Sequence, residues 1–494
     1  MKNYNILNRT IALLLGGTLA ALASCQSSEN TVDNETTSSS SDTTVAEQTE
    51  TEEAIEPSFE ACDYDGATFH IYAPDWGLYR NYFFADEQTG DVMNDAIYDR
   101  TMMVEEYLGI DITHSSGATE DLNVMNLMQQ TVMSGDDAYQ LVLTHCIQDV
   151  GSMLTAGLLY DWNNLEYCDL SQDYWNQSCN NNLSINGHQY YAVSDFMLPD
   201  PNCVLFNKGM IENYSLDDPY ELVRSGEWTL EKMIEMGSAV TSDLDGNSVW
   251  DINDQYGIGT ANDWYWNSLI YSSGLSLIDR DEQGNFELAI NNDDMYTLVE
   301  IVDNLVNGSN DAYLYDFNIP EEEKLMISRG QSLFQFESFN RLNLLRDSEV
   351  EYGILPYPKL KASQDGYYTN DWSGLMAIPK TITNPEMVGK TCELLAIYSR
   401  ETTIPAYYDL VLGTKLSRDE DSREMLELIF DNIVYDPGVN YFGFSSNIMP
   451  LFYVLHSMVI REGSGDFASW YARYAPGAES EIKQFVEAVS ELEA

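Results

Sequence analysis

Basic residues are scarce in this sequence. The chain of 494 residues carries 23 Lys and Arg against 81 Asp and Glu, which gives a formal net charge of −58. Nucleic-acid binding depends on Lys and Arg that neutralise phosphates, and so negative a body also repels anionic lipid headgroups. Nucleic acid is therefore excluded as a partner. Hydrophobic residues nevertheless make up 44% of the chain, so we expect a large folded body of two or more domains.

The motifs of common enzyme classes are also missing. The sequence has no H-E-x-x-H, no G-x-S-x-G and no G-x-x-x-x-G-K-[ST]. Its five histidines are scattered, and no two have the spacing of metal ligands on one helix. Carboxylates are so abundant that a pair at the separation used by glycosidases would arise by chance. We therefore predict no catalytic residues and no catalytic cofactor.

The cysteines form no C-x-x-C motif. Six of the seven lie beyond Cys25, and six cysteines allow fifteen pairings among which the sequence does not choose. Disulfides and buried free thiols both remain open.

No apolar run is long enough to span a bilayer comfortably. The longest one near the N-terminus, residues 11–22, follows Lys2 and Arg9, as in an export signal. It ends in L-A-S-C at Cys25, which resembles the bacterial lipobox. That resemblance implies that residues 1–24 are a lipoprotein signal peptide and that Cys25 becomes the acylated, palmitate-bearing mature terminus. The alternative is an ordinary secretory signal with a chance cysteine.

Residues 25–58 are predicted to form a disordered tether behind the lipidated cysteine. From residue 26 on, this stretch is rich in Ser, Thr and Glu, with nine acidic residues and no Lys or Arg. Such a composition buries too little apolar surface to offset the entropy of ordering. Acyl chains on Cys25 would hold the body at the membrane, because each buried CH₂ contributes about 0.8 kcal/mol. We expect an exported protein on the outer face of the bacterial cytoplasmic membrane.

Beyond residue 66 the pattern alternates between strands and helices. Residues 68–72 (TFHIY), 110–114 (IDITH) and 139–145 (YQLVLTH) read as strands. Apolar residues at helical spacing fill the gaps, from Ala96 to Leu108, ending at Gly109, and from Leu122 to Val132. Strands and helices alternating in this way predict an α/β protein with a mainly parallel sheet.

Five later segments resemble one family. They occur in a fixed order at wide spacing: LYDWNNL (159–165), INGHQYYAVSD (185–195), VLFNKGMI (204–211), EYGILPYPKL (351–360) and WSGLMAIPKTITNPEMVGKTCELLAIYS (372–399). They are similar to the extracellular solute-binding proteins of bacterial ABC importers, in the large sugar-binding class of maltodextrin-binding protein. The resemblance covers nearly everything after residue 66, although no single segment is a fingerprint.

The resemblance implies a two-lobed periplasmic-binding-protein fold of type II, with three inter-lobe crossings and a ligand cleft between the lobes. The implied N-terminal lobe comprises residues 66–200 and 376–416, and the C-terminal lobe comprises residues 204–372 and 417–494. The crossings would lie near residues 194–204, 372–376 and 413–417. Independently, open parallel sheets bind ligands at the carboxyl ends of their strands, so a cleft between two such lobes is the expected site.

Aromatic and polar residues in the loops at these strand ends are the candidate ligand contacts. Sugar sites combine flat apolar faces for the ring with polar groups for the hydroxyls. For each residue, core packing or simple exposure is the alternative. The predicted ligand-binding residues are Trp76, Thr144, His145, Asp200, Trp264, Trp266, Glu337 and Trp372.

Residues 243–254 (DLDGNSVWDIND) have the spacing of a calcium loop. The expected side-chain ligands are Asp243, Asp245, Asn247, Asp251 and Asp254, with the backbone carbonyl of Val249. Ser248 stands where an EF-hand has Gly, and Asp254 replaces the longer Glu, so we expect weak binding, with a Kd around 10⁻⁴–10⁻³ M. The expected role is a structural calcium ion, and the alternative is a metal-free turn.

Together these features predict a monomeric, lipid-anchored receptor that captures a carbohydrate, most simply an oligosaccharide, and delivers it to the membrane subunits of an ABC permease. A surface lipoprotein enzyme acting on glycans, an adhesion or scaffold lipoprotein, and a peptide-binding receptor remain alternatives. The sequence does not identify the sugar, its length or the permease.

Overall fold

The computed structural model describes residues 54–118, 122–261, 264–316, 319, 324–345, 348–411 and 420–492. Its compact unit begins at Ala54, a few residues before the predicted end of the tether. The early start has a physical reason, because Phe59 is buried and the backbone N–H of Ile55 donates to Glu401. The signal peptide, Cys25 and the tether up to residue 53 lie outside the described residues. Among the described helices, none is both long and apolar enough to span a membrane.

The first sheet has five strands in the order β2-β1-β3-β13-β4. β1 pairs in parallel with β2 and with β3, while β13 runs antiparallel to both β3 and β4. The three strands predicted before residue 150 are therefore confirmed, with β3 shorter than expected. The bounds are β1 Ala67–Ala73, β2 Ile110–Ser116, β3 Leu141–Leu143, β4 Tyr191–Ala192 and β13 Met376–Ala377.

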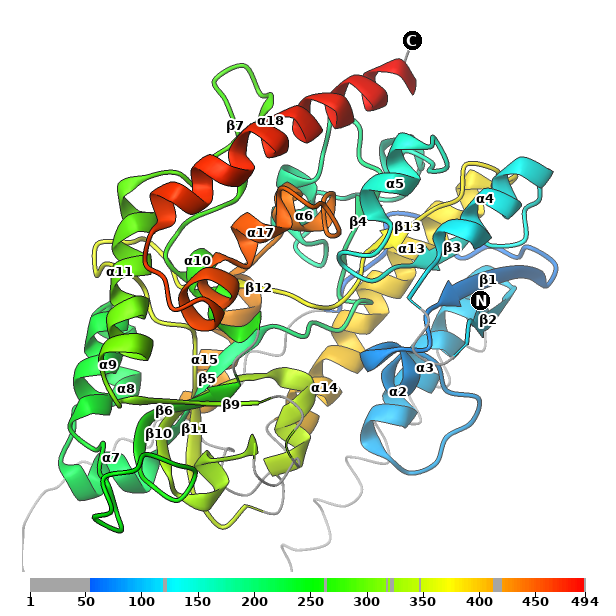
Figure 1. Cartoon of the computed structure of the whole chain (residues 1–494). Helices are drawn as coiled ribbons and strands as arrows, with labels where there is room; N and C mark the ends of the chain where they lie inside the picture. The colour runs from blue at the N-terminus through cyan, green and yellow to red at the C-terminus, as the bar shows by residue number, and fades with distance from the viewer. Residues whose placement is uncertain are drawn as a thin grey trace, which may run out of the picture. The chain divides into compact units, whose positions relative to one another are not determined.

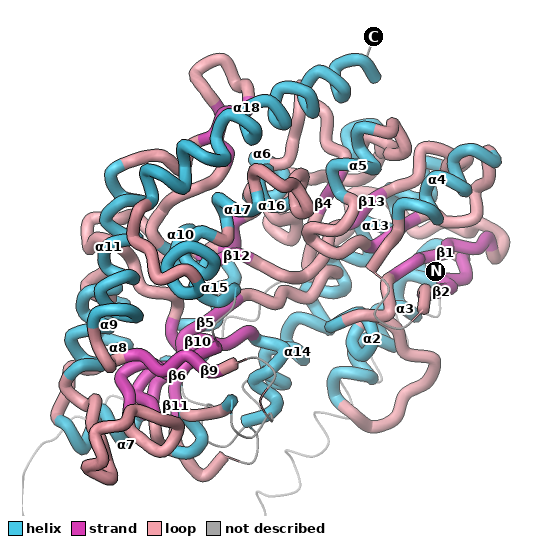
Figure 2. The backbone as a smooth tube through the Cα atoms, in the orientation of Figure 1, coloured by secondary structure: helices cyan, strands magenta, loops and turns pink. Residues whose placement is uncertain are grey.

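The second sheet also has five strands, in the order β11-β5-β10-β6-β9. β6 is parallel to β10 and β9, and β5 is antiparallel to β10 and β11. Figure 2 shows the strands of the two sheets as separate groups of magenta segments. The bounds are β5 Asn202–Asn207, β6 Tyr256–Ala261, β9 Ala312–Tyr315, β10 Ser332–Ser338 and β11 Tyr352–Leu355.

In each sheet four of the five strands run in the same direction, and one strand, β13 or β5, runs against them. The prediction of a mainly parallel sheet is therefore confirmed, apart from this one strand in each sheet. The antiparallel strands are those next to the crossings: β5 follows the first crossing, and β13 follows the second. The alternation of strands and helices indicates parallel βαβ units correctly, as in β1 and β2, but it carries no information about a strand that enters from the other sheet.

Helices cover both sheets, and their ends follow local sequence signals (Figure 1). In α3, the Asp91 side chain accepts a hydrogen bond from the Asn94 N–H (3.0 Å), and Gly109 ends the helix at φ 59°. This confirms the helix expected to end at Gly109. The helices are α2 Gly77–Tyr82, α3 Val92–Leu108, α4 Met125–Ser134, α5 Val150–Thr155, α6 Gln177–Asn182, α7 Lys208–Tyr214, α8 Pro219–Ser225, α9 Leu230–Ser238, α10 Ser268–Ser272, α11 Asp293–Gly308, α13 Pro385–Tyr398, α14 Ile404–Val411, α15 Glu420–Asp431, α16 Pro437–Asn440, α17 Met449–Phe452 and α18 Phe467–Leu492.

Two chain segments in the described residues run from one sheet to the other. The first leaves β4 and enters β5, and the second leaves β11, passes through β12 (Thr369–Asn370) and enters β13. An isolated antiparallel bridge between Pro201 and Asp371 joins the two segments. β12 also pairs in parallel with β14 (Ile433–Val434). The third predicted crossing, residues 413–417, lies outside the described residues.

The C-terminal part of the chain contacts elements that precede the first crossing. Asn440 donates to the Cys146 carbonyl oxygen (3.0 Å), Tyr441 donates to the Leu183 carbonyl oxygen, and α18 packs on α5. α18 also packs on β8 (Phe286–Leu288), which forms a hairpin with β7 (Ile278–Arg280). Figure 1 shows α18, in red, running past both β7 and α5.

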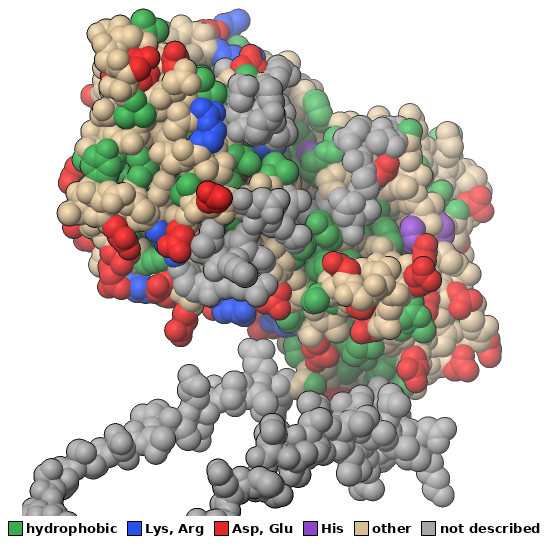
Figure 3. Space-filling model, turned by 90° about the horizontal axis from the view of Figure 1, so that it is seen from below, with side chains coloured by type: hydrophobic (Ala, Val, Ile, Leu, Met, Phe, Trp, Pro, Cys, Tyr) green, Lys and Arg blue, Asp and Glu red, His purple; other side chains and the backbone are tan. Residues whose placement is uncertain are grey.

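The face drawn in Figure 3 carries many more acidic than basic side chains, as the composition requires. The six cysteines beyond Cys25 are free thiols, which answers the question that the sequence left open. Four of them are buried: Cys146, Cys179, Cys203 and Cys392.

Candidate functional site

Loops from both sheets meet near the second crossing. Trp76 follows β1, and Thr144 and His145 follow β3, so both loops leave the carboxyl ends of adjacent strands. Because β13 is antiparallel to β3, the segment just before β13, which contains Trp372, reaches the same edge. Trp264 follows β6 of the second sheet. This arrangement matches the general rule that ligand sites form at the carboxyl ends of strands.

Trp76 and His145 form the first wall of the site. Their ring centroids are 4.4 Å apart, and Trp76 also makes an edge contact with Tyr79 at 6.5 Å. Burial lowers the pKa of His145 to about 4, so its imidazole is neutral at physiological pH. Its Nδ1 accepts a hydrogen bond from the Ile147 N–H (3.2 Å), which leaves the proton on Nε2. His145 is therefore a neutral hydrogen-bond donor next to an aromatic face.

Trp264 and Trp372 form the second wall. Their rings meet edge to face at 6.3 Å, and Trp372 also lies 6.3 Å from Phe452 of α17. Both indoles are half-buried. The Nε1 of Trp372 is buried and has no hydrogen-bond partner among the residues that the structure describes, although a buried indole N–H usually has one. The second wall thus offers two aromatic faces and an unused donor.

Gly374 holds the second crossing directly against the first wall. A Cβ at this position would lie 1.7 Å from the Thr144 carbonyl oxygen and 1.7 Å from the Tyr79 hydroxyl. The Thr144 N–H donates to Leu375 (2.9 Å), and the Tyr79 hydroxyl donates to Thr144 (2.8 Å). No side chain fits at this position, so only glycine allows this approach.

Asp371 connects the crossing segments. One of its carboxylate oxygens accepts the Asp200 N–H (2.8 Å) and the Ser373 N–H (3.0 Å), and the other accepts the Tyr435 hydroxyl (3.0 Å). These partners come from the first crossing, the second crossing and the segment after β14. A single buried carboxylate therefore fixes the backbone next to Trp372.

Four of the predicted ligand residues are buried in roles that already occupy them. Asp200 is 3% exposed, and its carboxylate accepts from the backbone N–H (2.9 Å) and the side-chain amide of Asn340. Glu337 is fully buried and pairs with Arg341 (2.9 Å). Trp266 packs on Phe336 in the second sheet's core, and the side chain of Thr144 is fully buried.

The structure thus brings Trp76 next to His145 and Trp264 next to Trp372, and it separates Trp266 from them. It also adds residues that the sequence did not indicate: Tyr79, Asp371, Gly374 and Phe452. Phe452 is 80 positions away from Trp372 in the sequence, and no spacing signal links the two.

Buried carboxylates give this region a pH-dependent stability. Burial raises the pKa of Asp200 to about 7 and that of Asp436 to about 6, against about 3.9 for an unfolded Asp. Between pH 4 and 7 the folded state therefore binds more protons than the unfolded state, and these groups lower stability as pH rises. His145 acts in the opposite direction between pH 4 and 6.5, because its pKa is lowered.

We expect Asp200→Asn to gain stability relative to wild type as pH rises from 4 to 7. The difference in unfolding free energy should grow by up to about 1.4 kcal/mol per pH unit, since Asn carries no charge to bury. Denaturant titrations at several pH values measure it, and comparing the two proteins cancels the effect of His145. Glu282→Gln, at an exposed position, is the control. A difference that does not change with pH would contradict the expectation.

Three carboxylates of the predicted calcium loop lie close together. Oxygens of Asp243, Asp245 and Asp254 all fall within 4.8 Å of one another. α9 begins after its N-cap Thr229 and precedes the loop, and β6 follows it, as predicted. Ser248 adopts φ 63°, the left-handed conformation for which EF-hands use Gly. The trio therefore fits a divalent cation.

Asp251, the fourth carboxylate expected as a ligand, is not part of that cluster. Asn247 Oδ1 accepts the Val249 N–H (2.5 Å), and Asp251 Oδ1 accepts the Asn253 N–H (2.8 Å). Asp254 is 1% exposed and accepts two backbone N–H groups of the loop, from Leu244 (3.0 Å) and Asp251 (2.9 Å). Asp254 thus also organises the loop without metal.

No protein-family model matches the chain, and no curated protein matches it. Solved structures do match, and they define the class of fold: the two sheets and the crossings between them form the two-lobed periplasmic-binding-protein fold of type II.

Three of these structures illustrate the match. UgpB of Mycobacterium tuberculosis, in complex with glycerophosphocholine, has a TM-score of 0.55 and 14% identity, covering 87% of this chain and 100% of that one. The GacH receptor of Streptomyces glaucescens, solved unliganded and with acarbose, has a TM-score of 0.52 and 12% identity, covering 86% and 98%. An ABC transporter solute-binding protein of Thermotoga lettingae, bound with α-D-tagatose, has a TM-score of 0.51 and 13% identity, covering 85% and 100%. At such identities the likeness shows the fold alone.

Proposed function

We propose that this protein is an extracellular solute-binding protein that captures a carbohydrate and delivers it to an ABC permease. The observation that carries the proposal is the set of aromatic faces, Trp76, Trp264 and Trp372, at loop ends that come from both sheets. Flat aromatic faces with nearby donors suit sugar rings and hydroxyls. Two of the matched structures hold sugar-type ligands, acarbose and tagatose, in the same fold.

In this proposal the residues divide into two groups. Trp76, His145, Trp264 and Trp372 contact the ligand, and Thr144, Asp200, Trp266 and Glu337 support the loops from beneath, because they are buried and packed or already hydrogen-bonded. The proposed N-terminal lobe comprises residues 66–200 and 376–416, and the proposed C-terminal lobe comprises residues 204–372 and 417–494. Contacts made from both lobes favour the closed form, so binding shifts the population toward it.

An enzyme acting on glycans is the weaker candidate. The buried carboxylates Asp200 and Asp371 are each occupied by donors of the protein, so neither is poised as an acid or nucleophile. A glycerophosphocholine-type ligand, as held by UgpB, is disfavoured because the formal net charge of the chain, −58, repels a phosphate.

Calorimetry with a panel of mono- and oligosaccharides tests the proposal. We expect at least one sugar to bind at micromolar Kd or tighter, about −8 kcal/mol, without being consumed. Short peptides and glycerophosphocholine complete the panel. If only peptides bind, the receptor assignment stands and the sugar assignment fails. If a glycan is cleaved instead, both fail.

We also propose that the acidic trio binds calcium as a structural ion. With a Kd of 10⁻⁴–10⁻³ M, 10 mM calcium should stabilise the fold by roughly 1–3 kcal/mol by mass action. The melting temperature should rise with calcium and fall with a chelator. Asp243→Ala with Asp245→Ala should abolish this response. Asp281→Ala, which removes a similar aspartate turn in the β7–β8 hairpin, should keep it. A response unchanged in the double variant would place the ion elsewhere.

Finally, we propose that Cys25 is acylated and anchors a monomeric receptor to the membrane through residues 26–53, since the compact unit begins at Ala54. We expect mass spectrometry of the membrane-extracted protein to find a lipid-modified peptide that begins at Cys25, and Cys25→Ser to release the protein into the soluble fraction. An unmodified N-terminus at another residue would contradict the anchor.

A further inference from the structure

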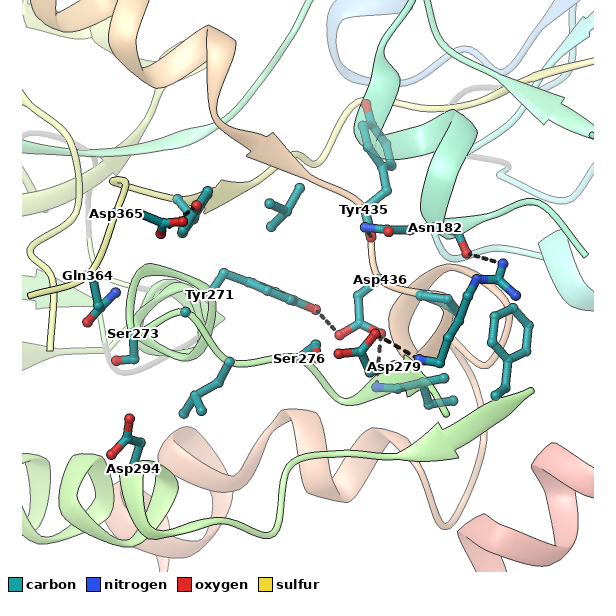
Figure 4. A pocket seen from close by; sticks show the side chains of 18 residues that line it. Asn182, Tyr271, Ser273, Ser276, Asp279, Asp294, Gln364, Asp365, Tyr435 and Asp436 are labelled. Atoms are coloured by element: carbon teal, nitrogen blue, oxygen red, sulfur yellow. Dashed lines mark hydrogen bonds between the residues drawn. The ribbon is translucent and has the colours of Figure 1, made fainter. Parts of the chain in front are cut away.

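A cavity lies away from the aromatic walls. It has a volume of about 480 Å³, within the range of small-molecule sites, and none of the predicted ligand residues lines it. Its walls come from α6, from residues 271–286, from the start of α11, from the turn at residues 364–368, and from β14 with the segment after it (Figure 4). Segments more than 250 positions apart in the sequence therefore converge on one hollow.

The walls carry aromatic faces. Tyr271 is 3% exposed and donates to Asp436 (3.3 Å), which fixes its ring, and Figure 4 shows this ring between the Asp365 side and the Asp279 side of the cavity. Phe286, Tyr368 and Tyr435 also line it. Such rings suit the apolar face of a sugar-sized molecule.

The polar lining is rich in acceptors. Four carboxylates, Asp279, Asp294, Asp365 and Asp436, face a single basic residue of the lining, Arg280. The Arg280 guanidinium is already used by the Ser184 carbonyl oxygen and by the Phe286 ring (4.6 Å). An anionic occupant is therefore excluded by charge, and the occupant must supply donors.

Hydrogen bonds and an ion pair from the protein partly offset the negative charge of these carboxylates. Asp436 accepts N–H groups of Leu277 (2.6 Å) and Gly438 (2.7 Å), Asp294 pairs with Lys361, and Asp365 accepts the Tyr368 hydroxyl (2.9 Å). Among the described residues, no three of these acids converge as a metal site does. Acceptors without concentrated charge suit hydroxyl groups better than ammonium groups or a metal ion.

We propose that this cavity is a second binding site, for a neutral, hydroxyl-rich molecule of the size of a mono- or disaccharide. The half-buried ring of Tyr368 provides its stacking face, and Ser276 with carboxylate oxygens of Asp279 and Asp365 receives its hydroxyls. The site is distinct from the aromatic walls but linked to them, because Tyr435, in the cavity wall, donates to Asp371 beside Trp372 (3.0 Å). The choice of a sugar as the occupant of this site rests on the carbohydrate-binding function proposed above.

Calorimetric titration of the full chain with maltose, continued to tens of millimolar, tests this site. We expect a weak binding class, independent of NaCl concentration. Ser276→Phe, which fills the cavity, should weaken this class at least tenfold and leave any tight class at the aromatic walls unchanged. Asp279→Asn should weaken it less. Glu282→Phe, at an exposed position of the same hairpin that does not line the cavity, is the matched control and should behave as wild type.

The possible results of this experiment test the cavity independently of the proposed sugar binding at the aromatic walls. The second site is overturned if the wild-type protein shows no weak maltose binding, or if Ser276→Phe leaves that weak binding intact. Either result counts against the site whether or not a sugar binds at the aromatic walls. A weak class removed by Ser276→Phe supports it even if no sugar binds tightly. Binding of 1,4-diaminobutane, weakened by salt and by Ser276→Phe, in place of maltose would overturn the assigned ligand class.

Discussion

Replacing Trp372 by alanine should weaken sugar binding by roughly tenfold or more. Trp372 contacts Trp264 and Phe452, and its buried N–H has no partner within the described part of the chain, so its loss removes both a stacking face and an unused donor. Removing an aromatic anchor from a desolvated site costs about 1–3 kcal/mol. Trp264→Ala should have a similar effect. Calorimetry with the tightest sugar of the panel measures both, with circular dichroism to confirm that the fold is intact.

Two further variants distinguish the possible reasons why Trp372→Ala would weaken sugar binding. Trp372→Phe keeps an aromatic face and loses the N–H, so it should recover part of the affinity if stacking dominates. Trp250→Ala removes another half-buried tryptophan, one that packs on Tyr256 next to the acidic trio, and should leave binding unchanged. If Trp250→Ala weakens binding as much as Trp372→Ala does, the effect is general destabilisation and Trp372 has no special role.

Gly374→Ala should be among the most damaging single substitutions in the chain. Its Cβ would lie 1.7 Å from the Thr144 carbonyl oxygen, which is backbone and cannot swing aside. Overpacking of this kind typically costs 1–3 kcal/mol, and a clash with backbone should reach about 3 kcal/mol or more. The shifted crossing would also move Trp372 away from the first wall. We expect a lower denaturation midpoint together with loss of sugar binding.

The control for this variant is Gly308→Ala, at the end of α11, where the nearest atom to a new Cβ is 3.9 Å away. This substitution should leave the free energy of unfolding almost unchanged. Adding Tyr79→Phe to Gly374→Ala removes the hydroxyl contact but leaves the Thr144 contact, so stability should not return. If Gly374→Ala, alone or combined with Tyr79→Phe, is as stable as wild type, the close contact between the second crossing and Thr144 does not depend on glycine at this position.

The local elements could be predicted because their signals are local. β1 and β2 follow from short runs of strand-forming residues, and α3 follows from its apolar spacing and the glycine that ends it. The acidic loop could also be predicted, since its spacing lies within twelve consecutive residues. Ser248 even adopts the left-handed conformation that its position requires.

The long-range contacts of the site could not be predicted. Asp371 reads as one of many acids, and only the fold shows that it joins Asp200, Ser373 and Tyr435. Gly374 gives no local sign that backbone 230 positions earlier passes against it. The directions of β5 and β13, the one antiparallel strand in each sheet, could not be predicted for the same reason, because both strands enter their sheets from a crossing.

Residue type alone also does not distinguish a ligand contact from a support. Trp264 and Trp266 are two positions apart, yet Trp264 contacts Trp372 while Trp266 is buried against Phe336. Asp200 and Glu337 are good acceptors for sugar hydroxyls in principle, but both are buried and paired with protein groups. Burial decides between these roles, and burial depends on the whole fold.

Small-angle X-ray scattering with and without the tightest sugar tests the central claim most directly. If the protein is a receptor whose lobes close on a carbohydrate, the radius of gyration should fall when the sugar is added, and Trp264→Ala and Trp372→Ala should require more sugar for the same change. Tight binding without compaction would contradict closure around the aromatic walls, and release of cleaved sugar would contradict a receptor altogether.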